Sequence, residues 1–194
     1  FEDVDAILFC TKNPIPLVDK INLIKIPKVL HVTLTPYNKD IEPNVPDKSL
    51  IIDAIKKISK IIGKENIYIR YDPIFLSDIY DIDYHKKAFS RLVKLLDGYT
   101  EHIIVSFIDD YKNVRKNMNV LRYHDFTRED FQEIGKYFSE EAKKYGMSVQ
   151  TCFEDNTLVE YGFIKNECMS KELAKRLTGK DYKKWKARSQ NKCE

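Results

Sequence analysis

Short hydrophobic runs alternate with longer amphipathic segments along most of this chain. Five apolar runs predict buried strands, at residues 4–9, 29–35, 67–70, 102–108 and 147–153. Four segments carry apolar residues at three- and four-residue spacing and predict helices, at residues 47–63, 83–98, 127–146 and 170–179. Because strands and helices follow one another in turn after the first two strands, the pattern predicts an α/β fold.

The predicted helices are long enough to cross over between parallel strands. Either a doubly wound sheet or part of a (β/α) barrel satisfies this order, and we expect a partial, TIM-like (β/α) barrel with mostly parallel strands. No internal repeat or Gly/Ser-rich linker divides the chain. We therefore expect a single barrel-like domain over residues 1–179, followed by a basic tail over residues 180–194.

Each predicted strand ends in polar or charged residues. Parallel strands bring their carboxyl ends to one rim, which is where α/β sheets and barrels bind their ligands. The five endings are Thr11-Lys12-Asn13, Thr35-Pro36-Tyr37, Arg70-Tyr71-Asp72, Ser106-Phe107-Ile108-Asp109 and Thr151-Cys152-Phe153-Glu154. The pattern predicts a polar ligand site at that rim.

Arg70 and Asp72 are the first candidates for catalysis. They lie two residues apart on a predicted strand, so their side chains share one face, and Pro73 fixes the backbone that follows. An arginine fork suits a carboxylate or phosphate, while an aspartate can orient the arginine, take a proton or hold a cation. A buried Arg–Asp pair with a purely structural role is an equally good interpretation.

Glu154 is the third catalytic candidate, for acid or base chemistry at the end of the fifth strand. Cys152 shares its face but has no neighbouring histidine in the sequence, so a small core residue is the simpler interpretation.

Four further residues are candidates for substrate binding: Lys12 for an anion, Asn13 for a polar ligand, and Tyr37 and Asp109 beside the same rim. Ordinary turn chemistry is the alternative for Asn13. The acidic segment 40–47, stiffened by two prolines, could form a lid.

The sequence lacks the motifs that usually identify several classes of protein. The four cysteines form no C-x-x-C pair, the four histidines form no zinc motif, and no metal site is expected from them. The glycine-rich dinucleotide, P-loop and hydrolase-elbow motifs are missing. No apolar stretch approaches the length of a membrane span and no signal peptide is recognisable. A cytoplasmic location is therefore the default expectation, with no membrane partner.

Charge is unevenly distributed in a chain whose net charge is +3. Residues 171–192 hold nine Lys or Arg and two acidic residues, with Tyr182 and Trp185 among them. Such a segment could bind a phosphate backbone and stack on bases. A solvated helix end is the more common role of such a charge run.

Read together, the strand endings resemble one prokaryotic family, called domain of unknown function 1848. The strings that carry the resemblance are Thr-Lys-Asn-Pro at residues 11–14, Thr-Leu-Thr-Pro-Tyr at 33–37, Glu-Pro-Asn-Val-Pro at 42–46, Arg-Tyr-Asp-Pro at 70–73 and Ser-Phe-Ile-Asp at 106–109. Shorter matches extend it over nearly the whole chain.

The resemblance implies a cofactor. Members of that family are similar to radical SAM enzymes in having a C-terminal C-x3-C-x2-C segment suited to a [4Fe–4S] cluster, which acts on S-adenosylmethionine. This chain lacks the family's N-terminal Arg-Arg-Thr-Asp-type strand and ends at Cys193-Glu194, where the cysteine-rich segment would begin. We therefore expect the chain alone to hold no cofactor, and a full-length member to hold the cluster and S-adenosylmethionine.

Three hypotheses about function follow. In the first, the chain is the barrel portion of a radical-SAM-like iron–sulfur enzyme, with a polar pocket at the strand ends and an unknown small-molecule or nucleic-acid substrate. In the second, it is a nucleic-acid-binding module that uses the basic C-terminal stretch. In the third, it is an inactive truncated fragment, because a barrel without its first strand exposes unpaired edges.

Overall fold

A six-stranded sheet, parallel throughout, forms the centre of the molecule. The structure, a computed structural model, describes residues 3–108, 112–152, 156–166 and 170–183. The strands lie in the sheet in the order in which they occur in the chain. They are β1 (Ile7–Thr11), β2 (Lys28–Thr33), β3 (Ile67–Ile74), β4 (His102–Phe107), β5 (Ser148–Cys152) and β6 (Ile164–Asn166).

The connections between the strands carry the helices. The α-helices are α1 (Lys48–Ile62), α2 (Ile82–Leu95), α3 (Lys112–Lys116), α4 (Met118–Leu121), α5 (Arg128–Lys143) and α6 (Lys171–Thr178). Short 3-10 helices occupy Ile15–Leu17, Ile21–Leu23, Lys64–Asn66 and Asn156–Tyr161.

Local sequence signals set the ends of the main helices. α1 stops at Gly63, whose φ of +89° suits a residue without a Cβ atom. Thr127 and Asp130 form a capping box at the start of α5. Asp81 caps α2 by accepting a hydrogen bond of 2.7 Å from the backbone N–H of Tyr84.

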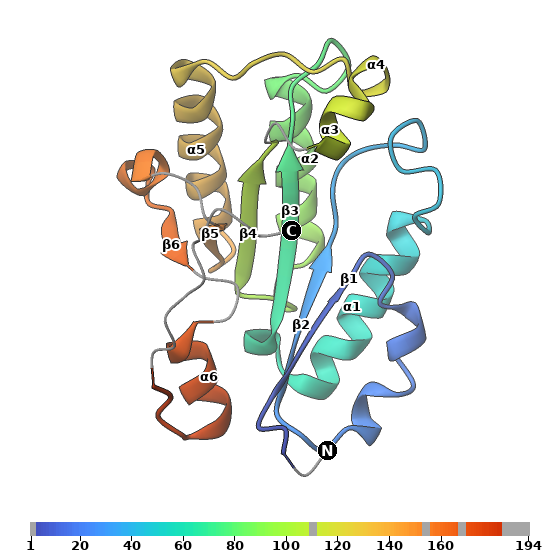
Figure 1. Cartoon of the computed structure of the whole chain (residues 1–194), viewed down its shortest axis with the longest axis vertical. Helices are drawn as coiled ribbons and strands as arrows, with labels where there is room; N and C mark the ends of the chain where they lie inside the picture. Colours follow the sequence, from blue (N-terminus) through green and yellow to red (C-terminus); the bar gives the residue numbers. More distant parts are fainter. Residues whose placement is uncertain (1–2, 109–111, 153–155, 167–169, 184–194) are drawn as a thin grey trace.

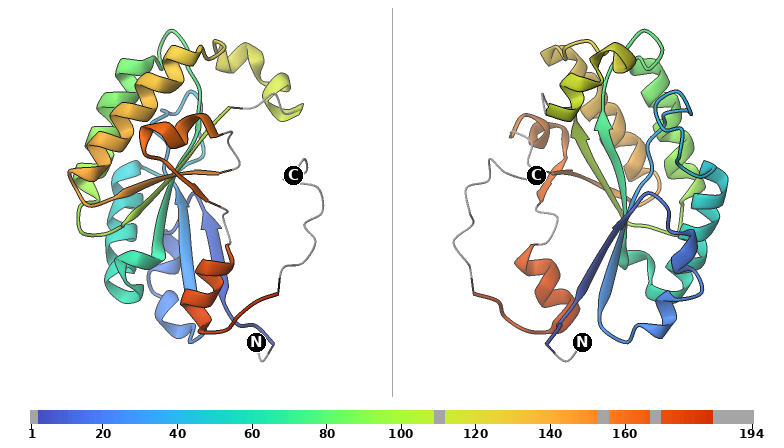
Figure 2. Two further views of the ribbon diagram at one scale, coloured as in Figure 1. Left: turned by 90° about the vertical axis from the view of Figure 1, so that its left-hand side faces the viewer. Right: turned by 45° about the vertical axis from the view of Figure 1, so that its right-hand side comes forward.

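Two layers cover the sheet unequally. Figures 1 and 2 show α1, α2 and α5 on one face of the sheet and α6 on the other. The main core lies under the first three helices, with Ile55 of α1, Phe89 of α2 and Phe138 of α5 fully buried. A smaller cluster joins Leu173 of α6 to Tyr68 of β3 on the opposite face. We call that opposite face the inner face of the sheet.

The predicted fold is confirmed at the level of a parallel α/β sheet. Sequential strand order is the winding of a (β/α) barrel, but β1 and β6 do not pair with each other in the described residues, so a barrel is not confirmed. The short strand β6 and the helices α3 and α4 were not predicted. Their few apolar residues give too little periodicity to detect.

β3 does not stop at Arg70, the end of the predicted strand, but runs on through Pro73. The strand continues to Ile74 through a register shift between Tyr71 and Ile74, and the Asp72–Pro73 peptide bond is cis. An irregularity in the ladder is one of the few places in a sheet that accept a residue without an N–H donor. The carbonyl of Ile74 then accepts a hydrogen bond of 2.8 Å from the N–H of Ile108, which keeps the ends of β3 and β4 together.

Candidate functional site

The inner face carries polar side chains in rows that cross the strands. Alternate residues of a strand point to opposite faces, so the residues not packed under the helices share this face. The strand register aligns two such rows, Cys10, His31, Tyr68, His102 and Ser148 in the first and Thr33, Arg70, Ile104 and Gln150 in the second.

The first row contains a stack of three rings. The ring of Tyr68 lies between those of His31 and His102, with centroid separations of 4.7 and 4.4 Å and small interplanar angles. The Nδ1 atom of His102 lies 3.2 Å from the Ser148 hydroxyl and 3.3 Å from the Gln150 amide nitrogen. These contacts fix the stack as a rigid floor on the inner face.

His31 is buried without hydrogen bonds. Its side chain is 1% exposed, and neither ring nitrogen has a hydrogen-bond partner among the described residues. Burial lowers the pKa of His31 to about 4, and the nearby Arg70 and His102 add to the effect. Burial likewise lowers the pKa of His102. Both imidazoles are therefore neutral at pH 7.

The helix α6 covers one end of this floor. Its residue Arg176 donates hydrogen bonds to the Asn66 side chain (2.9 Å) and to the Glu65 carbonyl (3.2 Å). Burial raises the pKa of the Tyr68 hydroxyl, and Arg176, which hydrogen-bonds to it, partly offsets that effect. α6 therefore covers this polar floor at the amino ends of the strands, where the residues of the floor lie near the starts of β3 and β4.

Arg70 and Asp72 form an ion pair on the inner face, towards the carboxyl end of β3. The prediction that the two side chains share a face is confirmed. The Arg70 side chain is 19% exposed and that of Asp72 only 9%. Because a guanidinium has five N–H donors, Arg70 can bind a carboxylate or phosphate while Asp72 holds its orientation.

Glu42 organises the neighbouring rim. Its carboxylate pairs with Lys12 after β1 and with Lys48 at the start of α1 (2.5 Å), and it accepts a hydrogen bond of 2.7 Å from the Thr35 hydroxyl. Burial alone would raise the pKa of Glu42, but these three partners together lower it. The carboxylate is therefore ionised at neutral pH and joins β1, β2 and α1.

The segment 40–47, considered above as a lid, is attached to the body of the protein. Besides the contacts of Glu42, the Asp40 carboxylate accepts a hydrogen bond of 2.7 Å from the Tyr80 hydroxyl. The Tyr80 hydroxyl also accepts a hydrogen bond from the N–H of Asn38. These contacts hold the segment against the body of the protein.

Replacing Glu42 with Gln is expected to lower the free energy of unfolding by about 2 kcal/mol, measured by urea denaturation at pH 7. The change leaves two lysines without their carboxylate. The expected loss lies between the cost of breaking a buried pair and that of an exposed one, because both lysines remain partly solvated.

Glu133→Gln is the matched control, since Glu133 forms a bridge to Lys86 with a side chain that is 51% exposed. We expect it to cost less than about 1 kcal/mol. Equal losses in the two variants would show that Glu42 does not organise the rim.

The other predicted site residues have different surroundings. Tyr37 is buried; its hydroxyl donates to the Pro73 carbonyl (2.8 Å) and accepts from the N–H of Phe75 (3.0 Å), so it braces the end of β3. The exposed Asn13 caps a turn by accepting a hydrogen bond of 3.2 Å from the N–H of Ile15. Asp109 and Glu154 lie outside the described residues, and so does the side chain of Cys152.

Part of the basic C-terminal stretch is already paired within the protein. Lys175 lies 2.7 Å from Asp181, and Lys180 pairs with Asp5. Residues 184–194 lie outside the described residues. Nucleic-acid binding by this stretch stays a prediction.

The described residues do not provide a cluster site. No three His, Cys, Asp or Glu side chains among them come together in an arrangement that could hold a metal ion. None of the helices in the same residues has both the length and the hydropathy that a membrane crossing needs.

Sequence reasoning missed most of the inner face. His31, Tyr68, His102 and Gln150 were not singled out, because the histidines were considered only as zinc ligands. The available signal was the alternation within each strand, which places these residues on the same face as Arg70.

Fold and site together define a parallel α/β protein wound in sequential strand order, with a polar inner face and charged side chains towards the carboxyl ends of its strands. Within that class, the chain belongs to the family described as "Domain of unknown function (DUF1848)", whose model matches residues 1–194. No curated protein matches the chain.

Proposed function

We propose that this chain forms the sheet of an iron–sulfur enzyme of the radical SAM type, and that its inner face binds the substrate. In this proposal the six strands form an incomplete (β/α) barrel. The cysteine-rich segment that the family resemblance implies would supply the [4Fe–4S] cluster, and S-adenosylmethionine would be cleaved there. Because the described residues hold no such ligand set, we derive no step through the cluster.

The observation that carries the proposal is the position of the Arg70–Asp72 pair. It lies on the face that α1, α2 and α5 leave uncovered, towards the carboxyl end of a central strand. That end of a parallel sheet is where α/β proteins bind their ligands. In the described part of the chain, α1, α2 and α5 cover the opposite face, α6 lies at the amino ends of the strands, and α3 and α4 lie beside the carboxyl ends.

The chain's own residues have three tasks in this proposal. Arg70 binds an anionic group of the ligand, with Asp72 as its positioning residue. Lys12, held by Glu42, adds a second positive charge at the rim. The buried, neutral stack of His31, Tyr68 and His102 supports this face without adding a net charge.

The test uses the protein expressed from its complete gene, reconstituted anaerobically with iron and sulfide. Incubation with S-adenosylmethionine and dithionite is expected to give 5′-deoxyadenosine and methionine, detected by mass spectrometry. Arg70→Ala is expected to lower this yield or its stimulation by substrate, whereas Lys94→Ala, at an exposed position of α2 on the other face of the sheet, leaves it unchanged. A filled cluster that yields no 5′-deoxyadenosine would overturn the proposal.

A further inference from the structure

A cavity lies between α1 and α2, on the face of the sheet opposite the inner face. Its volume is about 620 Å³, within the range of about 300–1,000 Å³ that is usual for small-molecule sites. Residues of both helices and of the segment after β2 line it. Thr35 and Pro36, which end the second predicted strand, and Tyr71 of β3 also line it, whereas the candidate site residues Lys12, Asn13, Tyr37, Arg70 and Asp72 do not.

The cavity exists because the helix layer is uneven. α2 and α5 are joined by the stacked rings of Phe89 and Phe138 and by a hydrogen bond of 2.9 Å between the hydroxyls of Ser90 and Tyr137. No ring contact, hydrogen bond or ion pair joins α1 to α2 in the part of the chain that the structure describes. The two helices therefore leave a space over the sheet.

The floor of this space is apolar. Leu34 after β2, Tyr71 of β3 and Leu92 of α2 are buried beneath it, and Ile52 and Leu95 flank it from the two helices. Such a surface favours the transfer of an alkyl or aryl group out of water.

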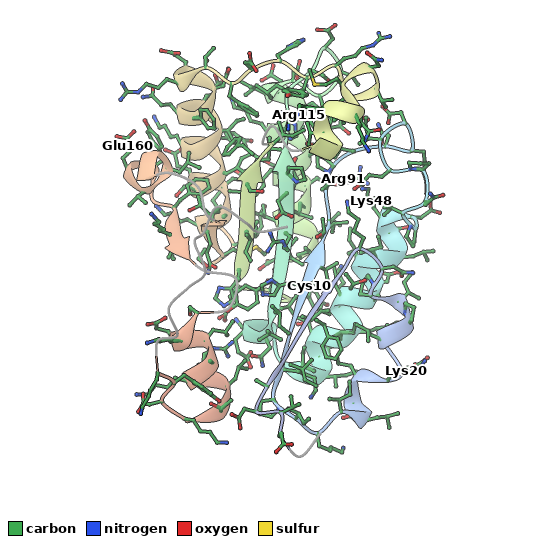
Figure 3. All side chains as sticks on the ribbon, viewed as in Figure 1. Cys10, Lys20, Lys48, Arg91, Arg115 and Glu160 are labelled. Atoms are coloured by element: carbon green, nitrogen blue, oxygen red, sulfur yellow. The ribbon has the colours of Figure 1, made fainter. Side chains whose placement is uncertain are left out.

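The walls are cationic. Lys48 and Lys56 line the cavity from α1, and Lys87 and Arg91 line it from α2, against one carboxylate, that of Asp53. Figure 3 labels Lys48 and Arg91, which approach the space from these two helices.

These four cations differ in their partners. Lys48 is paired with Glu42, and the ammonium of Lys56 lies 5.2 Å from the centre of the Tyr99 ring. Lys87 and Arg91 have no ion-pair partner among the described residues. The cavity therefore has an unneutralised positive charge on its α2 wall.

We propose that this cavity binds a small amphiphilic anion, a carboxylate or phosphate ester joined to an alkyl or aryl body. The body packs on Ile52, Leu92 and Leu95, and the anionic head pairs with Lys87 and Arg91. This site is separate from the inner face and does not depend on the function proposed for it. Its far end reaches Lys48 and Thr35, the residues that bind Glu42 at the rim.

The probes are octyl phosphate and octanoate, titrated into the purified protein below their micellar concentrations and followed by calorimetry. Octanol and octyltrimethylammonium are the neutral and cationic comparators, and inorganic phosphate tests the head group alone. At least one octyl anion is expected to bind at least about tenfold more tightly than all three comparators. The octyl anion that binds more tightly identifies the head group that the cavity prefers.

Two variants locate the binding. The double variant Lys87→Glu with Arg91→Glu is expected to weaken binding of the octyl anion at least about tenfold, since it reverses the charge of the α2 wall. Leu95→Gln, which changes only the apolar lining, is expected to weaken it about threefold or more.

The matched control is Lys57→Glu with Lys94→Glu, which produces the same change of net charge at residues of α1 and α2 that do not line the cavity. Binding within about twofold of the unmodified protein is expected, and circular dichroism checks that all variants are folded. Three results would overturn the proposal: neither octyl anion binds, the control weakens binding as much as the wall variant, or octyltrimethylammonium binds equally well.

Discussion

Lowering the pH from 7 to 4.5 is expected to reduce the free energy of unfolding by about 5 kcal/mol through two buried histidines, His31 and His85. Burial lowers the pKa of each to about 4 in the folded protein, from 6.5 in the unfolded chain. The unfolded chain therefore takes up protons as the pH falls below 6.5, whereas the folded protein does not. The stability that depends on keeping these two histidines neutral is therefore fully present above pH 6.5 and is lost as the pH falls from 6.5 towards 4.

Two hydrogen bonds fix the tautomer of His85, whereas burial keeps its ring neutral. Its Nε2 atom lies 2.9 Å from the Phe75 carbonyl, which can only accept, so Nε2 carries the proton. Its Nδ1 atom accepts from the Tyr71 hydroxyl at 3.0 Å. No such bonds hold His31 within the described residues, so its protonation is opposed by burial and by the positive charge of Arg70.

Because His31 makes no hydrogen bond within the described residues, its contribution to the pH dependence of stability can be measured by substitution. His31→Phe keeps a ring against Tyr68 and loses no described hydrogen bond, so it is expected to remove about half of the histidine contribution, about 2.5 kcal/mol between pH 7 and 4.5. His124→Phe is the control, because His124 is exposed. Urea denaturation at both pH values measures the difference, in which the carboxylates common to all variants cancel. An unchanged pH dependence in His31→Phe would contradict the expectation.

Phe89→Ala is expected to lower the free energy of unfolding by about 3–5 kcal/mol. Phe89 is fully buried, stacks on Phe138 at 3.8 Å and meets the edge of the Tyr71 ring at 5.7 Å. The substitution opens a cavity where α2, α5 and β3 meet. For a chain of this size the loss corresponds to a fall in Tm of about 10 °C, measured by calorimetry.

Two further variants of this kind calibrate the result. Phe89→Leu, which keeps most of the volume, is expected to cost less than about 1.5 kcal/mol. Leu23→Ala, at a position 73% exposed, is expected to stay within about 0.5 kcal/mol of the unmodified protein. A Phe89→Ala protein as stable as Leu23→Ala would show that the ring stack contributes nothing.

Periodicity in the sequence predicted the parallel sheet because buried strands and amphipathic helices have unmistakable patterns here. All five predicted strands and all four predicted helices are present, with ends displaced by a few residues. Closure into a barrel has no local signature, since it depends on contacts between the first and last strands. The predicted strand stops four residues short of the end of β3, because the register shift around Pro73 arises in the pairing of β3 with β4, which local sequence does not reveal.

The candidate site was predicted only in part. The pairing of Arg70 with Asp72 followed from their two-residue spacing, which fixes a common face. The partner of Lys12, Glu42, lies 30 residues away, so its role emerges only when β1 and the segment before α1 meet in space. The cavity between α1 and α2 was not predictable at all, because the divergence of two helices leaves no mark on the pattern of either.

The sequential order of the strands also bears on how the protein assembles as it is synthesised. Each strand pairs with the one made just before it, so the sheet can grow by addition at one edge as the chain emerges from the ribosome. α6 breaks this rule, since its Arg176 bonds to Asn66, 110 residues earlier. The polar stack of His31, Tyr68 and His102 is therefore expected to stay open to solvent until α6 docks, long after the strands that carry it have been made.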